Sequence, residues 1–143
     1  MILTLKAAGI DDLKKYRWLE APSDTALKTA EDLLMDLGAL KRADGPATIT
    51  PLGRRMLAFP VHPRYARMLI AAQEYKCVYH ACLVAALTQG RDLLLRNPGR
   101  DVTTVREDLL GSGSGPSDFW VLMRAWDYAV TNDFRMDALR KAG

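Results

Sequence analysis

Apolar residues recur at three- and four-residue steps along much of the chain, the spacing expected of helices that bury one face. The first clear stripe predicts a helix from Asp24 to Leu37. Its apolar positions are Leu27, Ala30, Leu33, Leu34 and Leu37. Ser23 can cap the first turn, and Gly38 suits the left-handed conformation that commonly ends a helix. Both ends of this predicted helix are therefore marked by local signals.

A small hairpin is predicted next. Residues 40–42 and 48–50 flank Asp44-Gly45, a dipeptide that favours the tight reversal of two strands. Thr50 then provides a cap, and Pro51 stands at the first helical position, which predicts a short helix from Pro51 to about Ala58.

The rest of the chain also has helical spacing, so the predicted fold class is mainly α. The apolar residues of 78–87 lie on all sides, which predicts a buried helix at the hub of a bundle. A Gly-Ser-rich stretch at 111–116 predicts a flexible connector. The expected helices lie at residues 63–75, 78–87, 102–110, 118–130 and 133–141. In the aromatic helix that Ser117 caps, the expected apolar stripe is Phe119, Leu122, Met123, Trp126 and Val130.

Length and composition limit the class of protein. With 143 residues, 49% of them hydrophobic and 26% charged, the chain is an ordinary globular protein and not a disordered, collagen-like or disulfide-stapled one. The apolar stretch from Cys77 to Leu87 is well short of the roughly 20 residues of a membrane span. The N-terminus lacks the basic region and unbroken apolar core of a signal peptide. We expect a cytoplasmic protein with no membrane partner.

Charge is unevenly distributed along the sequence. The chain carries 20 Lys and Arg against 17 Asp and Glu, a net charge of +3. Residues 41–100 hold ten basic and three acidic residues, a net charge of +7, whereas each flanking stretch has a net charge of −2. A basic middle section suits a nucleic-acid partner, although helix faces that are simply solvated have the same composition.

The sequence lacks the motifs of common enzyme classes. It holds no GxxxxGK[ST] phosphate loop, no GxGxxG and no GxSxG. His62 lies at a predicted helix entry and His80 in an apolar helix, so we assign both to structural roles. Cys77 and Cys82 do not have the CxxC spacing of a zinc site, and we expect them to be buried free thiols. No catalytic residue, metal site or cofactor site is expected in these residues.

One longer block resembles a known family. It contains the LGAL that ends the first helix and the run TPLGRRMLAFPVHPRYARMLIAA. The ordered positions are Pro22, Leu27, Ala30, Leu33, Leu37, Gly38, Ala39, Leu40, Thr50, Leu52, Gly53, Met56, Pro60, Pro63, Ala66, Met68 and Leu69. This pattern is similar to the helicase-associated domain of DEAH/RHA-type ATP-dependent helicases. LTLKAAGIDDLKKYRWLEAPS resembles the family's passage out of its second RecA-like domain, and Ser117-Asp118 with Trp126 resembles a later bundle helix.

The resemblance implies a fold and a domain organisation. Residues 1–18 would be a linker from the motor domain, residues 19–62 a degenerate winged helix with a small β-hairpin, and residues 63–143 a ratchet-like helical bundle. The sequence stops soon after its last predicted helix begins, so we expect the bundle to be truncated at the C-terminus. ATP and Mg²⁺ would belong to the motor domains of a longer parent helicase, and this fragment would not itself be an enzyme.

The resemblance also implies contact with single-stranded RNA or DNA and with the RecA-like motor domains of the same parent chain. Phosphate charge and base stacking hold a strand without reading its sequence. The candidate phosphate contacts are Lys41, Arg42, Arg54, Arg55, Arg64 and Arg67. Trp120 and Arg124 could stack on or clamp bases, although burial of Trp120 against the bundle is the more ordinary outcome for a tryptophan. We assign Trp18 and Trp126 to packing.

Two other classes of protein remain open. An autonomous winged-helix DNA-binding regulator would read base edges of a duplex with a recognition helix. A protein-interaction module would use exposed apolar residues and would have no affinity for nucleic acid. The sequence alone does not separate RNA from DNA.

Overall fold

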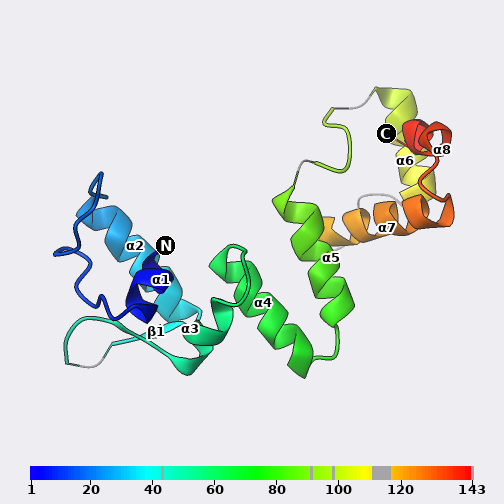
Figure 1. Cartoon of the computed structure of the whole chain (residues 1–143). Coiled ribbons are helices and arrows are strands. Elements are labelled where there is room, and N and C mark those ends of the chain that lie inside the picture. The colour runs from blue at the N-terminus through cyan, green and yellow to red at the C-terminus, as the bar shows by residue number, and fades with distance from the viewer. Residues whose placement is uncertain (43, 91, 98, 111–116, 143) are drawn as a thin grey trace. The chain divides into compact units, whose positions relative to one another are not determined.

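The chain is mainly helical, as the sequence predicts (Figure 1). A computed structural model describes residues 1–42, 44–90, 92–97, 99–110 and 117–142. Eight helices and one two-stranded sheet are formed within these ranges. They belong to two units, Met1–Lys76 (unit 1) and Cys77–Gly143 (unit 2). The expected connector at 111–116 lies outside the described residues.

Unit 1 begins with two helices. The first, α1 (Ile2–Ala7), has no counterpart among the predicted helices. The second, α2 (Asp24–Asp36), is the predicted amphipathic helix, and Leu27 and Leu34 of its apolar stripe are buried. The Ser23 hydroxyl accepts a hydrogen bond from the Ala26 amide at 3.2 Å, which satisfies one of the free N–H groups at the helix start. Gly38 has a φ of 72°, so the predicted left-handed stop is confirmed.

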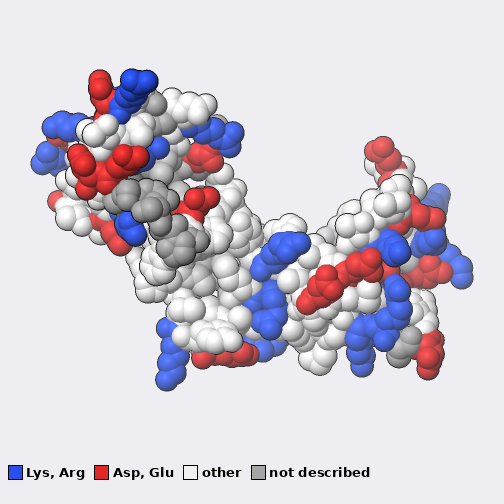
Figure 2. Space-filling model, turned by 180° about the vertical axis from the view of Figure 1, so that it is seen from behind, with Lys and Arg blue, Asp and Glu red and all other residues white. Residues whose placement is uncertain are grey.

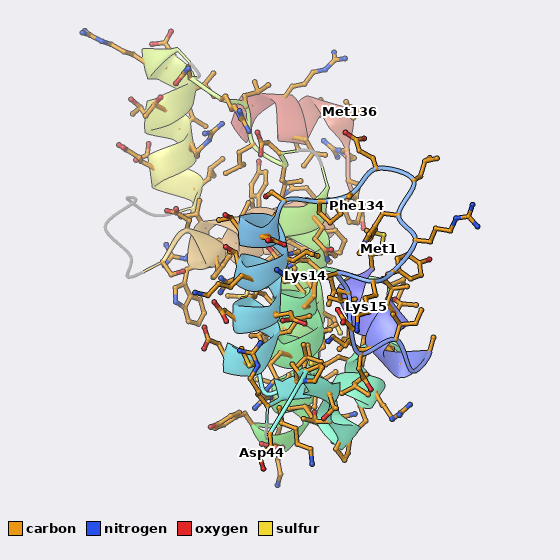
Figure 3. The ribbon with its side chains drawn as sticks, turned by 90° about the vertical axis from the view of Figure 1, so that its left-hand side faces the viewer. Met1, Lys14, Lys15, Asp44, Phe134 and Met136 are labelled. Atoms are coloured by element: carbon orange, nitrogen blue, oxygen red, sulfur yellow. The ribbon has the colours of Figure 1, made fainter. Side chains whose placement is uncertain are left out.

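The predicted hairpin follows. Strands β1 (Leu40–Lys41) and β2 (Thr48–Ile49) pair antiparallel, with Leu40 opposite Ile49 and Lys41 opposite Thr48. Asp44, labelled in Figure 3, lies in the loop that joins the two strands. Because the strands are two residues long, the pairing contributes little by itself, and the hairpin depends on packing against the helices.

Two proline-initiated helices complete unit 1. They are α3 (Pro51–Met56), which is shorter than predicted, and α4 (Pro63–Glu74). The Thr50 hydroxyl accepts from the Gly53 amide at 3.0 Å and donates to the Gly38 carbonyl at 2.7 Å. One side chain therefore caps α3 and ties it to the end of α2. The close approach requires Gly53, since a Cβ there would lie 2.2 Å from the Ala39 carbonyl oxygen.

The core of unit 1 draws on every helix of the unit. Its buried members are Leu3, Leu34, Ala39, Leu40, Ala47, Met56, Ala66 and Ile70. Leu3 comes from α1, and Ala66 and Ile70 come from α4. The N-terminal helix and α4 are therefore part of the same packed body as the hairpin.

Unit 2 consists of helices α5 (Val78–Gln89), α6 (Arg100–Leu110), α7 (Asp118–Thr131) and α8 (Met136–Ala142). Helix α7 contacts both α5 and α6, and α6 also contacts α8. Ser117 accepts from the Phe119 amide at 3.3 Å, so the predicted cap of α7 is confirmed. None of the described helices has the length and apolar character required to cross a bilayer.

The prediction that α5 is buried on all sides is wrong. Ala81, Val84 and Ala85 are buried, but Cys82 and Ala86 lie on an exposed face one turn apart. Cys77 and Cys82 are both exposed free thiols, which also corrects the prediction that they are buried. The described residues, among them those of α7, cover only part of the circumference of α5: Leu83 is also buried, but Cys82 and Ala86 are left exposed.

The buried face of α7 also differs from the predicted stripe. Phe119 and Val130 are exposed, and Leu122, Met123 and Trp126 are only partly buried. The buried residues of α7 are Ala125 and Ala129. Small side chains let neighbouring helices approach closely, so the alanines and not the largest apolar residues define this contact.

Candidate nucleic-acid interface

Two candidate phosphate contacts lie at the hairpin of unit 1. Lys41 is exposed in β1, and Arg42 follows it at the strand end. Arg42 is half-exposed, and its Nη2 donates to Glu31 Oε2 of α2 at 3.2 Å. The hairpin therefore presents two cations, one of which an acid already holds in place.

Two more candidates belong to α3. Arg54 and Arg55 lie in its last turn, and both are exposed. Cations are favoured at this position because the carbonyl end of a helix carries partial negative charge. Arg55 Nη2 also donates to Gln73 Oε1 near the end of α4 at 3.3 Å. This contact fixes the direction in which Arg55 extends.

The third pair occupies the first half of α4. Arg64 is exposed and Arg67 is partly exposed, one turn further along. The His62 Nδ1 atom accepts from the Arg64 amide at 3.4 Å and so caps the helix, which is a structural role. Gln73 lies about 180° around the helix from Arg64. Arg55, which contacts Gln73, is therefore not placed beside Arg64.

The remaining candidates, Trp120 and Arg124, are one turn apart on α7 in unit 2. Trp120 is 50% exposed, so the expectation that it is buried against the bundle is wrong. Phe119 beside it is 45% exposed, and its assignment to the buried stripe is wrong as well. Two adjacent aromatic rings are thus available to stack on an unpaired base.

The other tryptophans take part in packing within their own units. Trp18 is partly buried, and its Nε1 donates to the Leu13 carbonyl at 2.9 Å. Trp126 is partly buried and meets Phe134 edge-on, with ring centroids 5.5 Å apart. The assignment of both residues to packing is confirmed.

Basic and acidic side chains are interspersed over each unit in the view of Figure 2. Six of the eight candidates lie in unit 1 and two in unit 2. In the described part of the chain, no cluster of His, Cys, Asp or Glu could hold a metal ion. The candidate interface therefore consists of separate basic pairs on unit 1 and an aromatic platform on unit 2.

Two exposed carboxylates have lowered pKa values. A hydrogen bond from the Lys15 side chain lowers the pKa of Asp12, and the two charged groups lie 3.3 Å apart. The Arg135 guanidinium lowers the pKa of Asp137 in the same way, at 2.9 Å. Neither residue belongs to the candidate interface. Asp12 lies in unit 1 and Asp137 in unit 2, so each can report how the stability of its own unit changes in acid.

Sequence reasoning missed one charged cluster, formed by Lys6, Glu31 and Arg42 (the Glu31 cluster). Lys6 Nζ lies 2.9 Å from Glu31 Oε1, and Arg42 binds the second carboxylate oxygen. Its members come from α1, α2 and the end of β1, so the contact is long-range. Its signal in the sequence is a lone lysine, Lys6, within a mainly apolar N-terminal segment.

Together these features define a class of protein: a winged-helix-like unit with a short hairpin, followed by a small helical unit, both carrying exposed basic residues. Residues 30–61 match the winged-helix part of the helicase-associated domain (HA2), and residues 62–126 match its ratchet-like part. The chain belongs to the helicase-associated domain family, which confirms the resemblance found in the sequence.

Similar proteins are named as RNA helicases. The chain is 30% identical over 114 residues to mouse ATP-dependent RNA helicase DHX33, covering 78% of this chain and 16% of that protein. It is 29% identical over 130 residues to Escherichia coli ATP-dependent RNA helicase HrpA, covering 90% of this chain and 10% of HrpA. It is 31% identical over 107 residues to probable ATP-dependent RNA helicase DHX35 of Pongo abelii, covering 74% of this chain and 14% of that protein. The chain therefore spans less than a fifth of each of these relatives.

Proposed function

We propose that this chain is an accessory module of an ATP-dependent RNA helicase of the DEAH type. In this role it contacts single-stranded RNA and braces the RecA-like motor domains of a longer parent protein. The family match supports the helicase context, and the names of the relatives favour RNA over DNA. Residues 19–62 would act as the winged helix and residues 63–143 as the bundle, whose first helix, α4, packs within unit 1.

The observation that carries the strand contact is the exposure of the basic pairs on unit 1. A helicase must hold its strand without preference for sequence, and phosphate contacts meet that requirement. Arg54 and Arg64 are exposed on different helices of one packed unit. They can therefore contact phosphates along a strand from a fixed framework.

The aromatic pair on unit 2 has a complementary role in this proposal. Base stacking on an aromatic ring tolerates any sequence because every base has a flat face. Trp120 is half-exposed and Arg124 lies one turn further along α7. Stacking by Trp120 would hold the bases while the cations of unit 1 hold the backbone.

Chemistry belongs to the rest of the parent protein in this proposal. The sequence has no phosphate loop, so ATP and Mg²⁺ would bind the motor domains and these residues would hydrolyse no nucleotide. We propose a cytoplasmic location, where reducing conditions keep exposed thiols such as Cys77 and Cys82 free.

Binding of fluorescent oligonucleotides to the 143-residue chain tests the strand contact. We expect anisotropy to rise with a single-stranded RNA of mixed sequence, and affinity to fall steeply between 50 and 200 mM salt, as phosphate contacts require. A duplex DNA of the same sequence serves as the control and should bind more weakly. A preference for one duplex sequence would favour a winged-helix regulator, and no binding even at low salt would favour a protein-interaction module.

A further inference from the structure

Lys6 is a lysine in the interior of unit 1. It is 2% exposed, and its side chain has no contact with solvent. Its Nζ donates to the Asp11 carbonyl at 2.6 Å and pairs with Glu31 Oε1 at 2.9 Å. A buried ammonium group is costly unless it is paired, so Glu31 is the group that makes this position tolerable.

Glu31 serves two cations at once. Its side chain is 18% exposed, and its second carboxylate oxygen accepts from Arg42, whose side chain is 50% exposed. One side of the carboxylate therefore faces the interior and the other faces the hairpin surface. Lys6 cannot reach a ligand, whereas Arg42 can.

Glu31 and Arg42 also line an open hollow of about 360 Å³ in unit 1. Leu13 and Leu27 contribute apolar wall. Lys14 and Lys28 add cations, and Asp11, Asp12 and Asp24 add carboxylates. An incoming phosphate would therefore have to compete with Glu31 for the exposed guanidinium of Arg42.

We propose that Lys6 is a positioning residue for Arg42 and acts through Glu31. When Arg42 moves from Glu31 to a phosphate, the carboxylate keeps Lys6 as its partner and is not left unpaired in a partly buried place. Without Lys6, departure of Arg42 would leave the Glu31 carboxylate without a cationic partner, so Glu31 would bind Arg42 more tightly. The proposal rests on the proposed function, because it takes a phosphate of single-stranded RNA as the ligand of Arg42.

The N-terminal helix α1 gains a role from this coupling. The family match begins at residue 30, but Leu3 of α1 is in the core and Lys6 holds the acid that binds Arg42. Helix α1 thereby sets how readily the hairpin releases its arginine to the strand.

A double-mutant cycle in the 143-residue chain tests this coupling. RNA affinity is measured by anisotropy for the wild type, Lys6→Met, Arg42→Ala and the double variant. We expect Lys6→Met to weaken binding about two- to fivefold, the range of an exposed ion pair, and to have no effect when Arg42 is already absent. Lys15→Met is the matched control, because it removes one charge from an exposed lysine of the neighbouring loop.

A second variant keeps the test valid if Lys6→Met is poorly folded. Lys6→Met combined with Glu31→Gln removes both buried charges and releases Arg42, so RNA affinity should equal or exceed that of the wild type. Thermal unfolding of each variant establishes that binding is measured on folded protein.

The outcomes separate the inference from the proposed function. Two results would overturn the positioning role and leave the RNA contact intact. One is that Lys6→Met lowers RNA affinity by the same factor with and without Arg42. The other is that Lys6→Met leaves RNA affinity unchanged although Arg42→Ala lowers it. The positioning role is also overturned if the double variant Lys6→Met, Glu31→Gln binds RNA as weakly as Lys6→Met alone. Absence of binding by the wild type overturns the proposed function, and the inference with it.

Discussion

The two units bury different kinds of side chain. Unit 1 encloses large residues such as Leu34, Met56 and Ile70, and it adds a buried ion pair. The described buried residues of unit 2 include five alanines, and large residues such as Trp120 and Phe134 remain half-exposed. Buried apolar area is the main source of stability, so the difference indicates that unit 1 is held firmly by its own core and unit 2 more weakly.

The same contrast applies to the candidate ligand contacts. Unit 1 places its cations on a framework whose position is set by tight packing, and unit 2 offers exposed rings on a helix with an alanine contact face. Charge contacts benefit from fixed positions, whereas stacking on a ring tolerates small displacements. We therefore propose that unit 1 binds the backbone of the strand and that unit 2 stacks on its bases.

The largest expected effect on stability comes from adding a side-chain carbon at Gly53, where two backbone segments of unit 1 approach closely. Gly53→Ala places a methyl group 2.2 Å from the Ala39 carbonyl oxygen, so the backbone must move and stability should fall by about 3 kcal/mol. Gly90→Ala in unit 2 is the matched control, with its nearest neighbour at 3.8 Å, and should have little effect. Urea unfolding measures both. Similar losses for the two variants would contradict the difference in packing.

Removing the acid of the Glu31 cluster should have the next largest effect. Glu31→Gln leaves Lys6 charged in the interior, and because Glu31 is partly exposed we expect a loss of about 2 kcal/mol in the free energy of unfolding. Adding Lys6→Met should restore much of that loss. Urea unfolding of the single and double variants checks this, and additive losses would show that the two charges do not depend on each other.

A smaller difference is expected between the helix caps. Thr50→Ala removes the hydroxyl that caps α3 at the Gly53 amide and donates to the Gly38 carbonyl at the end of α2, so we expect a loss of about 1.5 kcal/mol. Ser117→Ala removes one exposed cap of α7 and should cost about 0.5 kcal/mol. Thermal unfolding compares the two variants. A larger effect at Ser117 would reverse the proposed order of the units.

The smallest expected effect is an acid dependence. The Lys15 hydrogen bond lowers the pKa of Asp12 in the folded state. The contribution of this hydrogen bond to folding stability is therefore fully present above the pKa of an aspartate in the unfolded chain, about 3.9. It is lost as the pH falls through the lower folded value. Stability curves of the wild type and Asp12→Asn should therefore differ slightly at pH 7 and converge in strong acid. A gap that widens in acid would contradict the assignment.

Signals local to the chain predicted much of unit 1. Ser23 and Gly38 mark the ends of α2, and Thr50 with Pro51 marks the start of α3, because caps and prolines act within a few residues. The basic hairpin and the family resemblance were also visible in the sequence. These features depend on neighbours along the chain and not on distant packing.

Features set by long-range contacts were not predictable in the same way. The position of Lys6 depends on the docking of α1, and the exposed face of α5 depends on which side meets α7. Trp120 has the same helical spacing whether it is buried or exposed, so periodicity could not decide its state. Its exposure is the structural observation that strengthens the candidate stacking role.

The salt dependence of RNA affinity tests the division of roles between the units most directly. The logarithm of the affinity is measured against the logarithm of salt concentration for the wild type, Arg64→Gln with Arg67→Gln, and Trp120→Ala. Each phosphate contact to a single strand contributes about 0.7 to the magnitude of this slope. We therefore expect the double arginine variant, which loses two such contacts, to lower the slope by about 1.4. Trp120→Ala should weaken binding about tenfold without changing the slope. An unchanged slope in the arginine variant would contradict the account.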